Sequence, residues 1–587
     1  MKILTRIFAA IGVMVVLSFV LSLLFSAWFT PSAPDVAERT VLRLDFSVPI
    51  YEAGAPTLLD LALDEDSFSL LSLIQALDRA SSDSRIKGLL ADLSNVTLAP
   101  AQIEEIRAAL LRFRAAGKFA YAYADSFGEL GPGNRAYWLA SAFDKIWLQP
   151  LGTVGLTGSA MSLPFAKDLL DKVGIKADMR QRHEYKGAAE MFTQTTLPAP
   201  LRENYTRLLN DLHTTMLADI GTARGIEQKT LRQLVDQAPL LDREALDARL
   251  IDALGYADEA RSAASRAARE GQEDSEWTEA PEMNVFSYLF AKPQTDPEPK
   301  ASVALIYVEG AITRLAGERG PMGEDQAVSA QELVEAITQA AGDEEIKAIL
   351  LRINSPGGSV AASESIHRAL ELAKANGKYV VVSMGEIAAS GGYWIATAAD
   401  TVFASPSTIT GSIGVVGGKI VFGELARKLG ITMAELGTGA NSDMFSPVKP
   451  FSPAASARIN ASLDSIYAAF AARVATARNL SPAQIDKVAR GRVWTGASAK
   501  EAGLVDELGG LREAFTAIKT HLGYTADDRL SVRMLPESES PFKRVLIILQ
   551  HLLSSAAPFS LSQLNSWLQL PALNSMGALV YTGPQVE

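Results

Sequence analysis

One serine of the chain, Ser390, has the surroundings that a catalytic nucleophile needs. It lies in Gly385–Trp394 (Gly-Glu-Ile-Ala-Ala-Ser-Gly-Gly-Tyr-Trp), between an apolar run at residues 379–382 and a helical run at residues 395–399. A turn of small residues between a buried strand and a helix puts the hydroxyl at the start of the helix, where exposed amides can receive an oxyanion. Glycines there also let a substrate backbone come close. Taken alone, such a turn more often serves close packing, with the serine as a helix cap.

An internal repeat gives this turn more weight. Apolar runs at residues 303–308 and 346–351 correspond to runs at residues 41–46 and 86–91. Residues 133–175 then align with residues 389–431 at a constant offset of 256, and 12 of these 43 positions are identical. A match of this length without a gap indicates a tandem duplication.

The two copies differ where chemistry would take place. Opposite Ser390–Gly392 the first copy has Asn134–Ala136, preceded by four extra residues. Opposite Asn354–Gly358 (Asn-Ser-Pro-Gly-Gly) it has Ser94–Leu98, which contains no glycine pair. Packing alone gives no reason for the copies to differ at these two places. The first copy is therefore expected to keep the fold without the nucleophile and its glycines.

A serine nucleophile needs a base, and histidine is the usual one. The chain has only five histidines, and none lies between Ser390 and residue 520: His183, His213, His367, His521 and His551. His367 falls in a helical segment, residues 364–375, where a solvated or capping role is expected. Lysine is the remaining candidate. Lys186 lies in Arg182–Phe192 of the first copy, and the corresponding stretch, residues 437–445, is shorter and contains no lysine.

These features together resemble a known family. The Ala-Ser-Gly-Gly-Tyr-Trp turn, the Asn-Ser-Pro-Gly-Gly loop, Tyr185-Lys186, the duplication and an apolar N-terminal segment are similar to signal peptide peptidase A (protease IV) in its long bacterial form. The resemblance covers nearly the whole chain. It implies the crotonase-like fold of the caseinolytic proteases, in two tandem domains of repeated ββα units. It also implies a homotetramer on the outer face of the bacterial cytoplasmic membrane that degrades signal peptides left after export.

The resemblance also implies a role for individual residues. In this sequence they are the nucleophile Ser390, the general base Lys186, the oxyanion-hole residues Gly357, Gly358 and Gly391, and the lysine's hydrogen-bond partner Ser412. A Ser/Lys dyad of this kind needs no metal and no cofactor. The residues around Ser390 are small, so we expect a hydrophobic groove that binds an extended peptide through its main chain.

Such a dyad sets a condition on the lysine. A free lysine has a pKa near 10.4, so at pH 7 it is almost wholly protonated and cannot act as a base. Lowering the pKa to about 7 costs roughly 4–5 kcal/mol, which burial away from carboxylates can supply. Glu184 and Glu190 flank Lys186 and would raise its pKa, so both are expected to point away from it.

The elements that must position these residues alternate between strands and helices. Strands are predicted at residues 41–46, 86–93 and 119–123, and helices at residues 70–80 and 101–116. This alternation indicates an α/β fold with largely parallel strands. A polar, proline-rich stretch at residues 262–301 is interpreted as a linker. The expected domains are thus an anchor region (1–34), a first repeat domain (40–261), a second repeat domain (302–535) and an apolar C-terminal tail (536–587) without an assigned role.

Composition and the N-terminus narrow the function classes. The chain of 587 residues is too long for one core, and its net charge of −12 without a basic tract argues against a nucleic-acid partner. The absence of cysteine excludes disulfides, thiolate metal sites and a cysteine nucleophile. Ile7–Phe29 has no charge and follows Lys2 and Arg6. As a helix it would be roughly 35 Å long, enough to cross a membrane and leave the following chain outside.

Alternative interpretations come from other classes. A cleaved signal peptide is the rival to an uncleaved anchor. A crotonase-like acyl-CoA enzyme would use the same oxyanion geometry but needs neither an anchor nor a serine. A non-catalytic membrane scaffold would account for the anchor and the repeat, but not for Ser390 together with Gly357 and Gly358.

Overall fold

The structure is a computed structural model that describes residues 33–53, 68–270, 279–295, 298–317, 327–536 and 578–580. The predicted anchor Ile7–Phe29 and most of the predicted tail 536–587 lie outside the described residues. Within the described residues, no helix has both the length and the apolar character needed to cross a membrane.

The first unit is built on a sheet of six parallel strands in the order β10-β6-β5-β4-β1-β11. Its strands are β1 (Thr40–Asp45), β4 (Ile86–Asp92), β5 (Phe119–Ala124), β6 (Lys145–Leu148), β10 (Ala253–Leu254) and β11 (Glu282–Asn284). The helices of this unit are α3 (Leu70–Ser82), α4 (Pro100–Ala115), α5 (Asn134–Ala140), α6 (Lys167–Val173), α9 (Gln228–Gln237), α10 (Asp242–Asp247), α11 (Ala257–Arg269) and α12 (Val285–Phe290). A short antiparallel pair, β7 (Thr153–Val154) and β9 (Leu240–Leu241), lies beside them.

The second unit repeats this arrangement strand for strand. Its parallel strands follow the order β22-β18-β17-β15-β12-β23. They are β12 (Ala301–Glu309), β15 (Ile346–Ser355), β17 (Tyr379–Ala389), β18 (Thr401–Ala404), β22 (Glu507–Leu508) and β23 (Leu530–Leu535). β17 also pairs with β19 (Ile409–Gly411), which pairs antiparallel with β21 (Val493–Thr495) as β7 does with β9. The helices of the second unit are α13 (Ala330–Gly342), α14 (Val360–Ala375), α15 (Gly391–Ala396), α16 (Gly423–Lys428), α18 (Pro482–Val488), α19 (Gly496–Glu501) and α20 (Leu511–His521).

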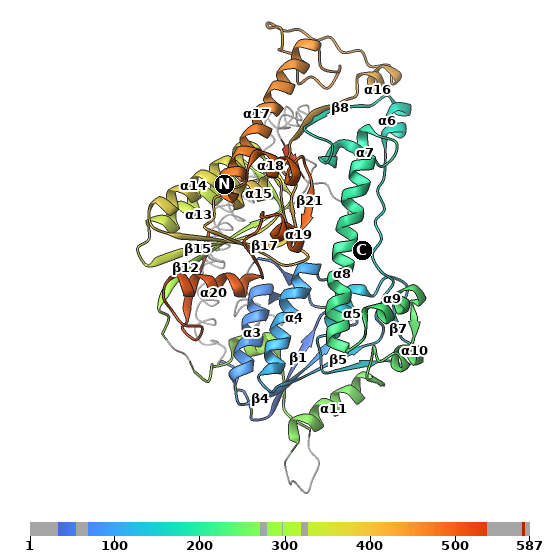
Figure 1. Ribbon diagram of the computed structural model, residues 1–587, viewed down its shortest axis with the longest axis vertical. Coiled ribbons are helices and arrows are strands. Elements are labelled where there is room, and N and C mark those ends of the chain that lie inside the picture. Colours follow the sequence, from blue (N-terminus) through green and yellow to red (C-terminus); the bar gives the residue numbers. More distant parts are fainter. Residues whose placement is uncertain are drawn as a thin grey trace, which may run out of the picture.

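Each sheet is buried on both faces, which is why its strands are continuous apolar runs. In the first unit α3 and α4 share one core with the sheet, and α11 covers the opposite face. In the second unit α13 and α14 cover one face and α20 the other. The predicted α/β class and the duplication are thus confirmed, and the two units lie one above the other in Figure 1.

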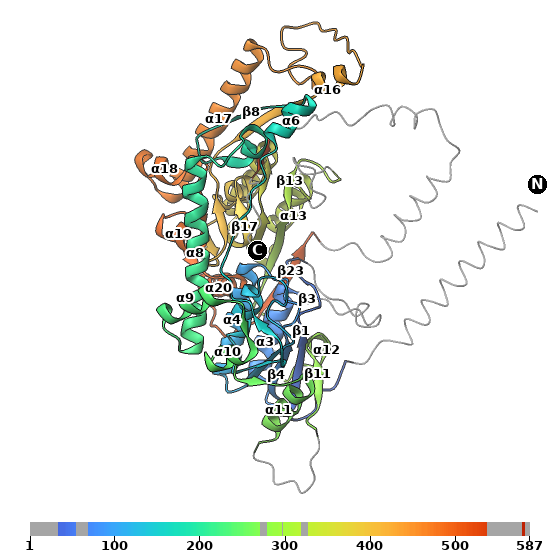
Figure 2. The ribbon, with the colours of Figure 1, turned by 90° about the vertical axis from the view of Figure 1, so that its right-hand side faces the viewer.

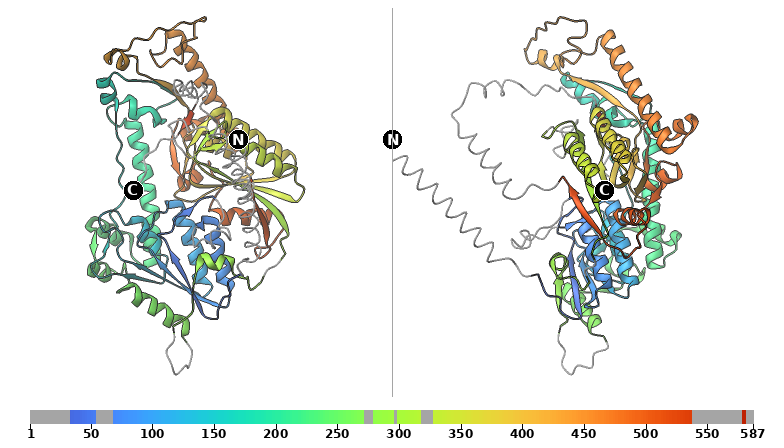
Figure 3. Two further views of the ribbon diagram at one scale, coloured as in Figure 1. Left: turned by 180° about the vertical axis from the view of Figure 1, so that it is seen from behind. Right: turned by 90° about the vertical axis from the view of Figure 1, so that its left-hand side faces the viewer.

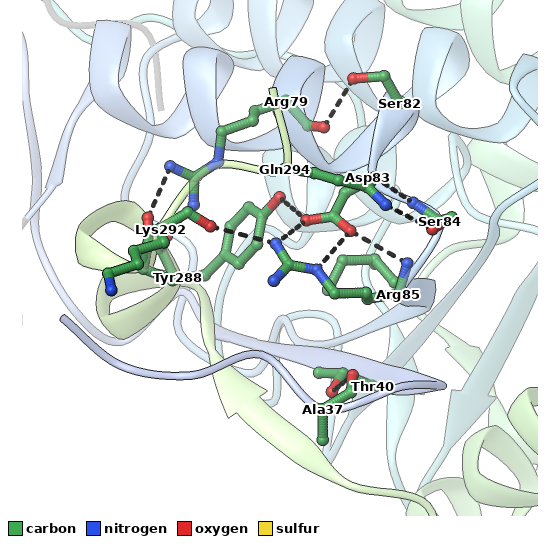
Figure 4. A network of polar contacts seen from close by, with 12 residues as sticks. Ala37, Thr40, Arg79, Ser82, Asp83, Ser84, Arg85, Tyr288, Lys292 and Gln294 are labelled. Carbon is green, nitrogen blue, oxygen red and sulfur yellow. Dashed lines mark hydrogen bonds and ion pairs between the residues drawn. The ribbon is translucent and has the colours of Figure 1, made fainter. Parts of the chain in front are cut away.

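The first unit extends beyond residue 261, where the sequence analysis ended it. Residues 257–269 form α11, and β11 joins the edge of the first sheet by pairing with β1. The following segment is anchored by polar contacts to the turn after α3, where Tyr288 and Arg85 both donate to Asp83 (3.1 and 2.7 Å; Figure 4). Composition marked this region as a linker because its few apolar residues are spread over short elements.

One long segment of the first unit connects the two units. β8 (Lys176–Gln181) leaves the first unit and pairs antiparallel with β20 (Val416–Val421) of the second. Helix α8 (Ala199–Arg224) then runs alongside both units, as Figures 1 and 2 show. We call residues 176–224 the first arm. The corresponding second arm, residues 432–478, contains α17 (Pro453–Arg478), and it leads away from the first unit (Figure 3).

A buried charge cluster also joins the units. Arg352 of β15 has no solvent exposure and pairs with Glu52 and with Glu105 of α4, the latter at 2.6 Å. Glu105 also accepts a hydrogen bond from the amide of Leu511 at the start of α20 (2.7 Å). Removing one partner of such a cluster would leave a buried charge uncompensated, so it holds the two units in a defined relative position.

Candidate active site

Ser390 occupies a strained turn between β17 and α15. Its backbone has φ 55° and ψ −115°, a conformation that is costly for a residue with a side chain. The turn is fixed by hydrogen bonds from the Ser390 amide to Gly411 O and from the Trp394 amide to Ser390 O, both 2.9 Å long. The side chain is completely buried. Strained residues held in this way are typical of functional sites.

The glycines beside Ser390 are required by space. A Cβ atom at Gly391 would lie 2.6 Å from Ser363 Oγ, and one at Gly358 would lie 2.2 Å from Ile312 O. Gly358 also has φ +157°, within the range that favours glycine. As a result, the backbone of β16 (Gly357–Ser359) lies directly against the start of α15, with the amide nitrogen of Gly358 only 3.1 Å from the position of a Cβ on Gly391.

Lys186 reaches Ser390 from the first arm, 204 residues away in sequence. It follows β8, whose pairing with β20 carries the chain of the first unit across the second. Its Nζ lies 2.8 Å from Ser390 Oγ, 2.9 Å from Ser412 O and 2.9 Å from Ser412 Oγ. The structure therefore brings together Ser390, Lys186 and Ser412, which the sequence analysis had singled out on separate segments.

The arm is held in place by specific polar contacts on both sides of Lys186. Arg490 pairs with Glu184 (3.0 Å), and the guanidinium of Arg492 lies over the ring of Tyr185 (3.6 Å to the centroid). Further along, the buried side chain of Asn204 on α8 both donates to and accepts from the backbone of Val493 in β21 (2.9 Å each). Around this contact, Leu201, Leu208 and Leu212 of α8 form an apolar cluster with Val493. The arm is thus a packed element, as a catalytic side chain requires.

The surroundings of Lys186 favour its neutral form. The residue is 1% exposed, and burial lowers the pKa of its amine from 10.5 to about 7. The flanking carboxylates do not oppose this shift, because Glu184 pairs with Arg490 and Glu190 accepts from Gln181 (2.7 Å). A neutral amine has two N–H donors and one lone pair. The two oxygens of Ser412 can take the donors, which leaves the lone pair for the hydroxyl proton of Ser390.

Backbone amides converge beside Ser390, but the predicted three glycines are not equivalent. The amide of Gly357 donates to Ser355 Oγ (3.1 Å) and is therefore already engaged. The first hydrogen bond of α15 starts at the Trp394 amide, so the amide of Gly391 precedes the intrahelical bonds. The amide of Gly391 is thus better placed than that of Gly357 to donate to an oxyanion.

His367 does not have the environment predicted for it. It lies on α14, as expected, but it is 5% exposed and is neither solvated nor a helix cap. Its ring contacts Arg473 of α17, with Arg473 Nη1 3.1 Å from Nδ1, and lies 3.9 Å from Glu371. Burial, reinforced by Arg473, lowers its pKa. The period of an amphipathic helix does not show which polar residue faces a second helix, and α17 covers this one.

Two glycines that shape the lysine site were missed by the sequence analysis. Gly491 has φ +87°, and a Cβ there would lie 2.4 Å from the backbone nitrogen of Lys186. A Cβ at Gly414 would lie 3.1 Å from Lys186 Cδ. The copies contain a signal for Gly491, because the corresponding position is held by Gln237 at the end of α9, where no lysine has to be accommodated.

Comparisons with known proteins give matches to both units of the chain. The profile of peptidase family S49 matches residues 112–270 and 372–525, once in each unit, and the Clp protease profile matches residues 320–410. The chain is 33% identical to Protease 4 of Salmonella typhi, over 82% of this chain and 77% of that protein. It is 30% identical to Protease 4 of Haemophilus influenzae, over 86% of this chain and 81% of that protein.

A plant relative matches over a similar part of the chain. The chloroplastic serine protease SPPA of Arabidopsis thaliana is 28% identical over 77% of this chain and 65% of that protein. The matches to the S49 profile fall on both repeat units, and the second includes Ser390. The chain therefore belongs to peptidase family S49, as a serine peptidase with a duplicated, Clp protease-like α/β fold.

Proposed function

We propose that this protein is a membrane-anchored endopeptidase that uses a Ser390/Lys186 dyad to degrade cleaved signal peptides and other hydrophobic peptides. The observation that carries the proposal is the position of Lys186 Nζ, which is buried 2.8 Å from Ser390 Oγ and has no carboxylate partner among the described residues. A base must lie within hydrogen-bond reach of the proton it removes and must have a pKa near the working pH, and Lys186 meets both conditions.

The reaction follows acyl-transfer chemistry. Neutral Lys186 takes the proton of Ser390 as Oγ attacks the peptide carbonyl carbon, and a tetrahedral oxyanion forms. The lysine ammonium then gives this proton to the leaving amine, the C–N bond breaks and an ester remains on Ser390. Water deprotonated by Lys186 hydrolyses the ester and releases a peptide carboxylate. Ser412 holds the amine in line through both of its oxygens.

We assign the oxyanion hole to the amides of Gly358 and Gly391. Both lie against the Ser390 turn, whereas the Gly357 amide donates to Ser355 Oγ. We infer that Gly357 contributes instead by its conformation, since its φ of +108° turns the chain into β16. Preorganised amides of this kind typically contribute about 10²–10³-fold to the rate.

The substrate is proposed to bind as an extended strand. The edge of β16 beside Ser390 can accept an antiparallel strand, because residues Ala578–Val580 (β24) of the chain pair with Gly357–Ser359 in this way. Main-chain hydrogen bonds of this type are largely independent of side-chain identity. This mode of binding supports the proposal that the substrates are peptides that share no fixed amino-acid sequence. The preference for apolar side chains rests on the small residues around Ser390 and on the family resemblance.

The proposal includes Ile7–Phe29 as the membrane anchor, with the repeat units outside the cytoplasmic membrane. A signal peptide left in the bilayer satisfies its own backbone hydrogen bonds as a helix, so it must leave the lipid before it can be cut. A peptidase tethered at the surface meets such peptides at a higher local concentration than a free one.

The proposal also includes an oligomer, for which the two arms give a physical basis. In the first arm α8 packs on β21, whereas the corresponding α17 exposes Arg458, the counterpart of Asn204. On the first unit, Leu241 and Leu151 are 58% and 92% exposed. Their counterparts in the second unit are Thr495 and Ser407, which are 1% and 4% exposed.

We therefore infer that the second arm of one chain packs on the first unit of the next, as the first arm packs within a chain. Such head-to-tail contacts close into a ring when the rotation fits. A ring of four chains is the assembly that the family resemblance implies.

A fluorophosphonate probe tests the central proposal. The probe should label the full-length chain in detergent, and both Ser390→Ala and Lys186→Met should abolish labelling and peptide cleavage. Ser363→Ala, which removes a neighbouring buried hydroxyl, should still be labelled. Labelling that persists in Ser390→Ala would show that the nucleophile is another residue.

A further inference from the structure

The first unit retains a cavity at the position where the second unit has its active site. Its volume is about 360 Å³, within the usual range of ligand pockets. One wall is the loop after β4, at Ser94–Thr97, and the other is the segment Gly128–Ala136 that leads into α5. These segments correspond to Asn354–Gly357 and to the turn around Ser390. The cavity is thus the counterpart of the peptide-binding groove.

The nucleophile position of this cavity is chemically inert. Asn134, the counterpart of Ser390, is 4% exposed. Its side-chain amide donates to Gly158 O (2.8 Å) and its side-chain oxygen accepts from Gly158 N (3.1 Å). Both ends of the carboxamide are therefore engaged with one residue, which fixes the floor of the cavity. Catalysis is lost here, but the cavity itself remains open.

The oxyanion position is occupied by a different hydrogen-bond donor. Arg135 is the counterpart of Gly391, and its guanidinium donates a hydrogen bond to the carbonyl of Leu98, the counterpart of Gly358 (3.5 Å). In the second unit, Gly358 and Gly391 are proposed to supply amides to the oxyanion. In the first unit, these positions hold Leu98 and the cation Arg135, which are hydrogen-bonded to each other. A guanidinium offers several N–H donors in a plane that fits a carboxylate.

The cavity lies beside the strand that carries the nucleophile. Although Glu386 of β17 remains accessible to solvent, desolvation raises its pKa, and the positive charge of Arg135 opposes that shift. Arg135 therefore acts on a residue four positions before Ser390. Among the described residues that line the cavity, the exposed ones are uncharged: Asn95, Thr97 and Pro132. One cation among neutral lining residues fits the single negative charge of a peptide's carboxylate end better than the several charges of a polyanion.

We propose that the cavity of the first unit is a non-catalytic site for the carboxylate end of a peptide, bound by Arg135. The proposal rests on the proposed function for its ligand class, since both cleaved signal peptides and the products of the acyl-enzyme step end in a free carboxylate. A bound carboxylate end would keep a peptide next to the catalytic groove between successive cleavages.

Binding of matched peptides to the inactive chain tests this site. The full-length Ser390→Ala chain in detergent is titrated with a fluorescent Leu/Ala-rich decapeptide ending in a free acid, and with the same peptide ending in an amide. We expect the acid to bind about tenfold more tightly, the usual effect of a hydrogen bond to a charged group. Arg135→Gln should remove this difference, and Arg135→Lys should restore part of it.

A second pair of variants covers the case in which Arg135→Gln fails to fold. Thr97→Asp on the exposed rim should weaken binding of the acid and not of the amide, and Thr97→Asn is its neutral control. Equal binding of acid and amide, or a difference that survives both Arg135→Gln and Thr97→Asp, would overturn the proposal. Probe labelling of Ser390 is measured separately, so failure of this site is distinguishable from failure of the proposed peptidase.

Discussion

Asn134 and Ser390 occupy the same position of the repeat, each after a buried parallel strand and at the start of a short helix. The backbone of the two units is so alike that the strand order is the same from one edge of the sheet to the other. At this position, however, one side chain is hydrogen-bonded to the backbone of Gly158 and the other contacts the buried amine of Lys186. A shared fold thus supplies the place for a reaction, and a few side chains decide whether the reaction occurs.

The contrast continues behind the two helices. The indole N–H of Trp138 donates to Asp219 of α8 (2.9 Å), and Arg107 pairs with the same carboxylate (3.5 Å). In the second unit, Trp394 donates to Glu364 of α14 (3.1 Å). There the positions of Arg107 and Asp219 hold His367 and Arg473, which line a cavity of about 520 Å³. The need to satisfy a buried tryptophan N–H is conserved between units, while the partner that does so has changed.

The two arms show the largest difference. α8 packs against the second unit in the arm that also carries Lys186, whereas α17 has the same length of 26 residues but exposes the corresponding face. Within one chain, the arm of the first unit completes the second unit, and the arm of the second unit has no such partner among the described residues. The two duplicated units therefore contribute differently to the site: the first carries Lys186 and the second carries Ser390.

Substitution of either dyad residue should have the largest effect, because it removes the activity that distinguishes the second unit from the first. Ser390→Ala and Lys186→Met should each lower kcat/KM by roughly 10⁴-fold or more, because residues that act as a unit are not additive. Peptide-ester hydrolysis measures this. Asn134→Ala in the first unit is the matched control and should keep full activity. Turnover retained in Lys186→Met, together with an inactive His367→Ala, would move the base to the histidine.

The glycine behind Lys186 should come next in magnitude. Gly491→Ala places a methyl group 2.4 Å from the backbone nitrogen of Lys186, at a residue whose φ is +87°, so the lysine must shift. A displacement of about 1 Å can lower the rate by roughly 10²-fold, which steady-state kinetics would detect. Gly342→Ala, where a Cβ has no neighbour within 4 Å, should be neutral. Normal kinetics for Gly491→Ala would mean that the lysine position is not critical.

The pH profile tests the base itself. Lys186 is active only when neutral, and burial lowers its pKa to about 7. Below this value kcat/KM should fall by about tenfold per pH unit, and above it the profile should level. The same shift makes Lys186 a cost to folding at neutral pH that decreases as pH rises from about 7 towards 10.5. Lys186→Met should therefore be inactive yet more stable at pH 7. A profile that moves when His367 is replaced by Gln would contradict a lysine base.

The smallest effect is expected from the arm contacts. Asn204→Ala leaves the Val493 backbone groups buried without partners, which costs about 1–3 kcal/mol and should lower the thermal midpoint. Its counterpart Arg458→Ala on α17 should leave the midpoint of the isolated chain unchanged. In analytical ultracentrifugation, Arg458→Ala should weaken assembly. Unaltered assembly in both Arg458→Ala and Leu241→Asp would refute the proposed contact between chains.

Local sequence was sufficient for much of the fold. The strand predicted at residues 86–93 is β4, the helix at residues 70–80 is α3, and the parallel alternation follows from continuous apolar runs separated by helical ones. The comparison of the copies also singled out Ser390 and Lys186, because each lies where the two copies differ in a way that packing does not explain. The boundary at residue 261 was misplaced, since a strand of three residues such as β11 has too short a pattern to be recognised.

Tertiary structure alone decided how these residues meet. No sequence period indicates that β8 pairs with β20, that Arg352 joins Glu52 and Glu105 from the other unit, or that His367 is covered by α17. These contacts depend on which surfaces of two folded units face each other, and burial there sets the pKa of Lys186. The sequence by itself determined a candidate nucleophile, a candidate lysine and a duplicated α/β fold. Only the packing of one unit against the other lowers the pKa of that lysine and places it beside the serine, because desolvation and distance are properties of the assembled chain.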